Sequence, residues 1–465
     1  MTKPNIIFIM TDNQSPWTLG CYGNEEIQTP NIDRLAREGI LFTRCYSVNA
    51  VCSPSRATFL TGLIPSQHGV HCYLSAGGAQ IGSDAYNTIG EFRSLPQSFS
   101  ELGYVCGLSG KWHLGDNLKP QEGFTYWITK PHGHTSTFYD AEVIENGQIR
   151  TEPSYLTDFW TNHAIRFIEQ NKEHPFFLFL AYNGPYGLGK SLLNPAKNRY
   201  ADYYADKELK SFPRESTHPW LHNNREYINN LTAIRRYAAE ISGIDDGVGQ
   251  VMNTLERLGL DENTLVIFTA DQGLCGGHHG MWGMGDHSRP LHTYDETAHI
   301  PMIYRHPAAI PAGKQSDLMI SHYDFLPTVL NYLGLENKMP HKPRLPGRDY
   351  SAVLQGQQIE WDNVIYYEFE NCRMIRTPDW KYTRRFPDGP EELYDLRNDP
   401  SEQKNLAHDQ ECADIQDQLY QRLAEFFDYY ADPKYDLWRD GGSKSILLTF
   451  NKKPLPPSAE TRTES

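Results

Sequence analysis

The sequence predicts an α/β fold, with a large and mostly parallel central sheet flanked by helices and a smaller C-terminal α+β subdomain. Short apolar runs of strand length alternate with longer segments of helical periodicity along most of the 465 residues. This alternation is typical of a parallel sheet joined by crossover helices. Hydrophobic residues form 39% of the chain and charged residues 22%, so a folded globular protein is expected.

The individual elements follow from these patterns in order. The apolar run at residues 5–10 predicts the first strand. A helix is expected at residues 30–38, because Thr29 can cap it and Pro30 suits its first position. The same alternation predicts strands at residues 104–109, 176–181, 264–270 and 299–305, and helices at residues 155–171, 227–258 and 323–333.

The composition changes near residue 340, where the stretch HKPRLPGRD is rich in Pro, Arg and Lys. Two β-rich runs, at residues 364–369 and 380–385, and a helical pattern at residues 411–429 follow it. We therefore predict three parts of the chain. They are a main domain at residues 1–345, a C-terminal subdomain of antiparallel strands and a helix at residues 346–450, and a polar tail at residues 451–465.

Charge and composition exclude several classes of protein. A net charge of −15 has the wrong sign for tracking a phosphate backbone, so no nucleic-acid partner is expected. No apolar run is long enough to span a membrane, and the N-terminus lacks the pattern of a signal peptide. We expect a cytoplasmic protein, or a periplasmic or secreted one if a leader has been removed. The eight cysteines contain no CxxC pair, which argues against a disulfide framework or a zinc knuckle.

The segment CSPSRATFLTG, residues 52–62, predicts a short helix. Ser53 and Pro54 suit its cap and first turn, so Cys52 is expected beside the free N–H groups of the helix start. These groups and the helix dipole favour a bound anion, and Arg56 would lie on the same turn. The alternative is that Cys52 is an ordinary buried core residue.

Polar residues follow two of the predicted strands. Asp12 and Asn13 come directly after the first strand, and Asp271 and Gln272 after the strand at residues 264–270. In an open parallel sheet, ligands gather at the carboxyl ends of strands. Carboxylate and amide oxygens suit calcium or magnesium better than zinc. Taken singly, either Asp could instead be a turn or cap residue.

With these pieces in place, the chain resembles the formylglycine-dependent sulfatases of the alkaline phosphatase superfamily. In their signature, which CSPSRATFLTG matches, the Cys is oxidised after translation to formylglycine. The resemblance implies an alkaline phosphatase-like sheet, a catalytic role for the main domain and maturation by a formylglycine-generating enzyme. Further similar segments are PNIIFIMTDN, GCYGNEEIQTPNIDRLAREGILF, GKWHLG, DDGVGQVMNTLERLGLDENTLVIFTADQG and ELYDLRNDPSEQKNLA.

The resemblance also implies roles for individual residues. The hydrated formylglycine made from Cys52 would supply the nucleophile, and a divalent cation, calcium or else magnesium, would position it and the sulfate oxygens. Arg56 and Lys111 would stabilise negative charge, and His113 would be the base that regenerates the aldehyde and expels sulfate. The implied metal site comprises Asp12, Asn13, Cys52, Asp271 and Gln272.

The sequence departs from the family pattern at several site positions. Asn13 replaces a frequent second Asp, and Gln272 stands where Asn or His is more usual. Tyr186 stands where the family commonly has a His, and Met284 where a Lys is expected. A thioether replaces neither the charge nor the proton of a lysine.

Nearby residues could compensate for these losses. We predict His279 as the leaving-group acid because it directly precedes the family-like GMWG, with His287 and His292 as alternatives. The residues predicted to bind substrate are Tyr186, Lys190, His287, Arg289 and His292.

A sulfated carbohydrate is the expected substrate. Stacking on sugar rings is one interpretation of the aromatic and histidine residues in the long connections, and ordinary loop packing is the other. These residues are Tyr73, Tyr86, Trp127, His132, His134, Tyr186 and Trp220. The runner-up function is a phosphodiesterase or phosphonate monoester hydrolase of the same superfamily. The third is a non-catalytic sulfoglycan-binding relative, which Tyr186 and Met284 would favour.

Overall fold

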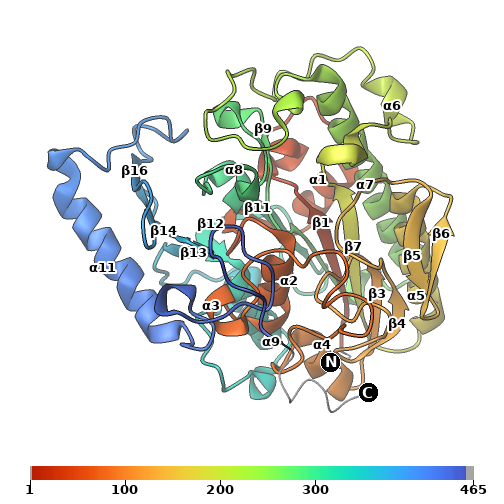
Figure 1. The fold of residues 1–465 in the computed structure, drawn as a ribbon. Helices are drawn as coiled ribbons and strands as arrows, with labels where there is room; N and C mark the ends of the chain where they lie inside the picture. The colour runs from red at the N-terminus through yellow and green to blue at the C-terminus, as the bar shows by residue number, and fades with distance from the viewer. Residues whose placement is uncertain (1–2, 457–465) are drawn as a thin grey trace.

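The structure, a computed structural model, describes residues 3–456 and is built on an eight-stranded sheet (Figure 1). The strand order is β12-β2-β11-β8-β1-β7-β3-β4. Strand β11 is antiparallel to its neighbours β8 and β2, and the other neighbouring pairs are parallel. The strands are β1 (Asn5–Asp12), β2 (Ile40–Tyr46), β3 (Val105–Gly110), β4 (Phe124–Ile128), β7 (Phe176–Pro185), β8 (Thr264–Ala270), β11 (His299–Arg305) and β12 (Lys314–Ser321).

Helices cover both faces of this sheet. Successive side chains of a strand point to opposite faces, and in β1 Ile7 and Ile9 belong to one core while Ile6 and Phe8 belong to the other. This confirms the predicted α/β architecture. The first core includes residues of α1 (Pro30–Arg37), α5 (Leu156–Asn171) and α7 (Leu231–Leu258), and the second includes residues of α2 (Cys52–Thr61), α4 (Leu95–Glu101) and α9 (His322–Tyr332).

A second, antiparallel sheet forms the C-terminal part, with strand order β13-β14-β15-β16. The helix α11 (Ala413–Tyr430) lies beside it at the left of Figure 1 and packs there through Leu419, Leu423 and Phe427. The α+β character of this part is confirmed, whereas its boundary at residue 346 stays a prediction. Of the expected tail, residues 457–465 lie outside the described residues. The strands are β13 (Ile365–Phe369), β14 (Cys372–Arg376), β15 (Trp380–Arg385) and β16 (Glu392–Asp395).

The remaining elements are short. The strands β5 and β6 form a hairpin, and β9 and β10 form another small antiparallel pair. The bounds are β5 (Ala141–Glu145), β6 (Gln148–Glu152), β9 (Cys275–Gly276), β10 (Trp282–Gly283), α3 (Pro65–His68), α6 (Tyr200–Tyr203), α8 (Asp295–Ala298) and α10 (Ser351–Leu354). All eight cysteines, which lie within the described range, are free.

Some elements differ from the sequence-based expectations for physical reasons. Strand β7 continues to Pro185 because its last residue pairs with Asp12 of β1. The long helix begins at Leu231, where the Asn230 side chain accepts a hydrogen bond from a backbone N–H of the first turn. Strand β12 lies at the edge of the sheet and carries several polar residues. Apolar runs in the sequence therefore do not predict it. Within residues 3–456, no helix has the length and hydrophobicity to cross a bilayer.

Candidate active site

Four neighbouring strands deliver polar residues to one edge of the central sheet. The strands β8, β1, β7 and β3 are adjacent and parallel, so their carboxyl ends meet there. Asp271, Tyr186 and Lys111 directly follow three of these strands, and Asp12 is the last residue of β1. The site therefore lies where ligands gather in open α/β sheets.

Two carboxylates and two cationic side chains form a buried network at this edge. Arg56 donates from Nε and Nη2 to Asp271 Oδ2, at 3.0 and 2.9 Å, and from Nη1 to the Lys111 carbonyl at 2.6 Å. The Lys111 ammonium forms an ion pair with Asp12. All four side chains are at most 1% exposed. Buried charges of this kind need partners, and here each carboxylate has a cation.

The donor atoms between these groups suit an oxygen-liganded divalent cation. Single ligand atoms of Asp12, Cys52 and Asp271 lie within 4.8 Å of one another. Gln272 Nε2 lies 3.3 Å from Asp12 Oδ1 and also contacts Asn13 Oδ1, so acceptor oxygens converge on one point. Gln272 Oε1 is buried and has no hydrogen-bond partner among the described residues. Rotation of the Gln272 amide group would exchange Nε2 and Oε1 and bring the oxygen beside Asp12 and Asn13. This would complete a hard, oxygen-rich ligand set.

Cys52 is the first residue of α2, which begins two positions earlier than the sequence suggested, because the N-cap is Val51 and not Ser53. Its side chain is buried, and burial raises the pKa of its thiol to about 12 although the Lys111 charge opposes this. The thiolate is the nucleophilic form of cysteine, so the unmodified residue is a poor nucleophile near neutral pH. Residue 52 lies beside Asp12 and Asp271, a position that suits an oxygen nucleophile rather than a thiol.

His113 is held as a neutral base. Its Nε2 donates a hydrogen bond to the Leu74 carbonyl at 3.0 Å, which leaves Nδ1 unprotonated. Burial holds the pKa of His113 well below its usual range, and Nδ1 has no partner in residues 3–456. Gly133 packs against the His113 ring, and only glycine fits there because a Cβ would lie 2.0 Å from Nδ1. A free lone pair is therefore available on a buried imidazole.

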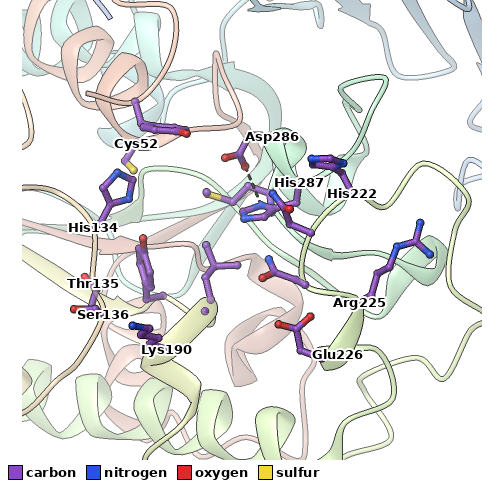
Figure 2. Close-up of a pocket in the computed structure, with 17 residues that line it drawn as sticks. Cys52, His134, Thr135, Ser136, Lys190, His222, Arg225, Glu226, Asp286 and His287 are labelled. Carbon is purple, nitrogen blue, oxygen red and sulfur yellow. Dashed lines mark hydrogen bonds and ion pairs between the residues drawn. The ribbon is translucent and has the colours of Figure 1, made fainter. Parts of the chain in front are cut away.

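A cavity of about 670 Å³ opens over Cys52 (Figure 2). Predicted site residues Tyr186, Lys190 and His287 line it, and so does Met284. Of the aromatic candidates, Tyr73 and His134 line the cavity, whereas Trp127 is buried with its Nε1 bonded to the Asn117 carbonyl. Residues that the sequence did not single out also contribute, namely His222, Asn223, Arg225, Glu226 and Asp286.

His287 is the cavity histidine with a carboxylate partner. Its Nδ1 lies 2.9 Å from Asp286 Oδ1, and Figure 2 shows this pair. Burial opposes the charged imidazole, but the Asp286 carboxylate outweighs it and raises the pKa of His287. Within the described residues, no hydrogen bond involves Nε2, so this nitrogen is free to meet a ligand. The adjacency of Asp286 and His287 was the sequence signal that could have identified the pair.

The structure places His279 elsewhere, so the expectation that it serves Cys52 needs correction. His279 lines a separate cavity of about 660 Å³. Its Nε2 lies 3.0 Å from Glu296 Oε2, its Nδ1 3.3 Å from Gln403 Nε2, and its ring stacks on Tyr294 at 3.7 Å. Both nitrogens are thus engaged within the protein. Trp220, one of the aromatic candidates, lines this second cavity too.

Neither His292 nor Arg289 lines the cavity over Cys52, and their predicted role in substrate binding stays a prediction. His292 is 1% exposed and lies with its ring 4.9 Å from that of Tyr294. Arg289 donates to the carbonyls of Asp286 and Ser288. The contacts of Arg289 therefore hold the backbone on either side of His287.

Known proteins match most of the chain. The family model described as Sulfatase matches residues 4–335, and a second, described as N-sulphoglucosamine sulphohydrolase, C-terminal, matches residues 280–428. The N-acetylglucosamine-6-O-sulfatase of Bacteroides thetaiotaomicron is 28% identical over 92% of this chain and 87% of its own. An uncharacterised sulfatase of Escherichia coli is 30% identical over 98% and 94%.

Solved structures resemble the chain as well. One is described as a complex with its substrate, D-glucosamine-2-N,6-O-disulfate. It has a TM-score of 0.73 and 27% identity, and the match covers 92% of this chain and 98% of that one.

Proposed function

Because the chain belongs to the sulfatase family and is a sulfuric ester hydrolase, we propose that it cleaves a sulfate ester of a carbohydrate at Cys52. The observation that carries the proposal is the convergence of Asp12, Asp271, Arg56 and Lys111 on this buried cysteine. The relative named for N-acetylglucosamine 6-O-sulfate and the structure with a disulfated glucosamine support a sulfated amino sugar as the substrate.

The residues present fit both groups that such chemistry requires. Asp12, Asn13, Asp271 and Gln272 would hold a cation, and calcium is favoured over magnesium because several protein oxygens converge. When bound, the cation neutralises charge on the sulfate oxygens, and position 52 in its formylglycine form supplies the attacking hydroxyl.

Two charged side chains are placed to stabilise the developing negative charge. Arg56 and Lys111 are held by the carboxylates of Asp271 and Asp12, so little reorganisation is needed when sulfate arrives. We assign His113 to the second half of the reaction, in which sulfate is released. With position 52 in its formylglycine form, the free Nδ1 would be able to accept the proton whose loss accompanies release of sulfate.

The leaving oxygen of a sugar is basic and needs a proton. His287 is our proposed donor because it lines the cavity over Cys52 and Asp286 stabilises its protonated form. Its position three residues after Met284 supports the view that it replaces the lysine expected there. Tyr186 keeps its proton because burial raises its pKa, so its hydroxyl can orient a substrate oxygen.

An activity screen tests the proposal. The protein, co-expressed with a formylglycine-generating enzyme, is assayed against an aryl sulfate, sulfated hexosamines, an aryl phosphodiester and an aryl phosphonate monoester. We expect hydrolysis of the sulfates and no turnover by Cys52→Ala. Faster hydrolysis of the phosphodiester or phosphonate would favour the runner-up function. Binding of sulfated sugars without hydrolysis of any ester would favour the non-catalytic one.

A further inference from the structure

Two cationic side chains on the rim of the Cys52 cavity have no partner in the described part of the chain. Lys190 lies in the short helix η3 (Gly189–Leu192), and Arg225 begins the helix η4 (Arg225–Tyr227). Both are exposed and line the cavity, and neither side chain forms a hydrogen bond or ion pair within residues 3–456. In the view of Figure 2, Cys52 and Arg225 lie on opposite sides of the cavity, with Lys190 below.

We propose that Lys190 and Arg225, which lie apart on the cavity rim in Figure 2, offer two positions for a second anionic group of the substrate. The substrate would then carry, besides the sulfate that is cleaved, another sulfate or a carboxylate on the same or the adjoining sugar. This inference rests on the proposed function, because it assumes that the first sulfate is bound at Cys52.

The charge distribution along the cavity supports a second anion. Near Cys52, the charges of Arg56 and Lys111 are paired with those of Asp271 and Asp12. Among the described residues the rim cations have no such carboxylate partner, although the whole chain carries a net charge of −15. Unpaired cations facing a cavity raise the local concentration of anions and select for them. Arginine can also hold a sulfate or carboxylate through two parallel hydrogen bonds.

The size of the cavity leaves room for such a group. A volume of about 670 Å³ lies within the range that holds a ligand of drug size, larger than one sulfate and its ring. Ser136 and Asn223 also line the cavity and offer neutral polar groups that suit sugar hydroxyls. The reacting sulfate and a second anion can therefore occupy the cavity together.

Glu226 provides a substitution that should change substrate binding in the opposite direction to loss of a rim cation. This carboxylate lines the same rim and, like the two cations, has no side-chain partner in the described part of the chain. Its negative charge opposes the binding of an anion there. Neutralising it should strengthen binding of a doubly anionic substrate, whereas removing the cation that holds the second anion should weaken it.

The experiment measures binding without turnover, in the Cys52→Ala background, by calorimetry. The ligands are a monosulfated hexosamine, a disulfated hexosamine and a monosulfated hexosamine joined to a uronate. Added Lys190→Ala or Arg225→Ala, whichever removes the cation that holds the second anion, should weaken binding of the doubly anionic ligands roughly three- to fivefold, the range for exposed charge pairs. The loss for the monosulfated sugar should be clearly smaller. Lys172→Ala, at an exposed position on the C-cap of α5, is the matched control.

The outcomes separate the alternatives. Added Glu226→Gln should tighten binding of the doubly anionic ligands, and added salt should reduce every one of these effects. The ligand that responds more strongly identifies the second group as a sulfate or a carboxylate. Equal losses for singly and doubly anionic ligands, or weaker binding with Glu226→Gln, would overturn the subsite. Failure of the proposed function would appear separately, as absent turnover of an aryl sulfate by the mature protein.

Discussion

Two histidine–carboxylate pairs lie in the same stretch of sequence but belong to different cavities. His287 pairs with Asp286 over Cys52, and His279 pairs with Glu296 in the second cavity. In both, burial opposes the imidazolium and the carboxylate raises the histidine pKa. Only the His287 pair leaves Nε2 free among the described residues, whereas Gln403 and Glu296 engage both nitrogens of His279.

This difference shows that a perturbed pKa does not by itself identify a catalytic group. His279 has a positive φ of 55° within η6 (His278–Gly280), and this backbone turns its ring onto Tyr294. His287 follows Met284 in a separate turn, beside the cavity. The two pairs therefore differ in whether the histidine has a ring nitrogen without a partner in the described residues, and in whether it faces the cavity over Cys52.

Metal binding should give the largest difference between the two regions. Besides Asp12, Cys52 and Asp271, the side chains of His279, Glu296 and Glu402 also lie close enough to hold an ion. There, however, the Lys381 ammonium already contacts Glu402. We expect chelation to abolish turnover, and Asp271→Asn to lose the metal by elemental analysis. Glu296→Gln should retain it, and loss of the metal from that variant alone would reverse the assignment.

Replacing the two histidines should separate catalysis from structure. His287→Ala should lower turnover of a sugar sulfate by roughly 10²–10⁴-fold, the usual contribution of a general acid. The loss on an activated aryl sulfate should be much smaller, because its leaving anion is already stable. His279→Ala should affect both substrates equally, through stability. Equal losses with His287→Ala would instead indicate a role in sulfate binding.

The pH profile should depend on Asp286. Because this carboxylate raises the pKa of His287, it keeps the imidazole protonated to higher pH. Asp286→Asn should therefore lower that pKa, by about one unit or more, and move the basic limb of kcat for a sugar sulfate to lower pH. An unchanged basic limb, measured with the aryl sulfate profile as control, would exclude His287 as the titrating acid.

The second pair should contribute to stability, with a smaller effect. Burial raises the pKa of Glu296, but the hydrogen bond from His279 outweighs it and lowers that pKa to about 2, while the pKa of His279 is raised. The pair stabilises fully between the unfolded values of about 4.5 and 6.5. Its contribution falls as pH drops toward 2 or rises through the folded pKa of His279. Glu296→Gln should cost about 1–3 kcal/mol in that window by denaturant unfolding. A constant difference across pH would contradict this.

Much of the fold and part of the site could be predicted because they depend on local patterns. Asp12 and Asp271 were identified because parallel strands bring their carboxyl ends together. The positions of Lys111 and His113 followed only from the family resemblance. His279 was misplaced because neither its neighbours in sequence nor its charge reveal that Tyr294 and Gln403 capture its ring. The rim residue Arg225 was missed because its loop has no periodic pattern.

The most direct test of the account concerns Cys52. Preparations in which different fractions of Cys52 are converted to formylglycine can be obtained by varying the co-expressed maturation enzyme. Peptide mass measurement gives the fraction, and turnover of a sulfated hexosamine is measured on the same samples. We predict activity proportional to the converted fraction, with none at zero conversion. Full activity in protein whose Cys52 is unmodified would contradict the proposed nucleophile.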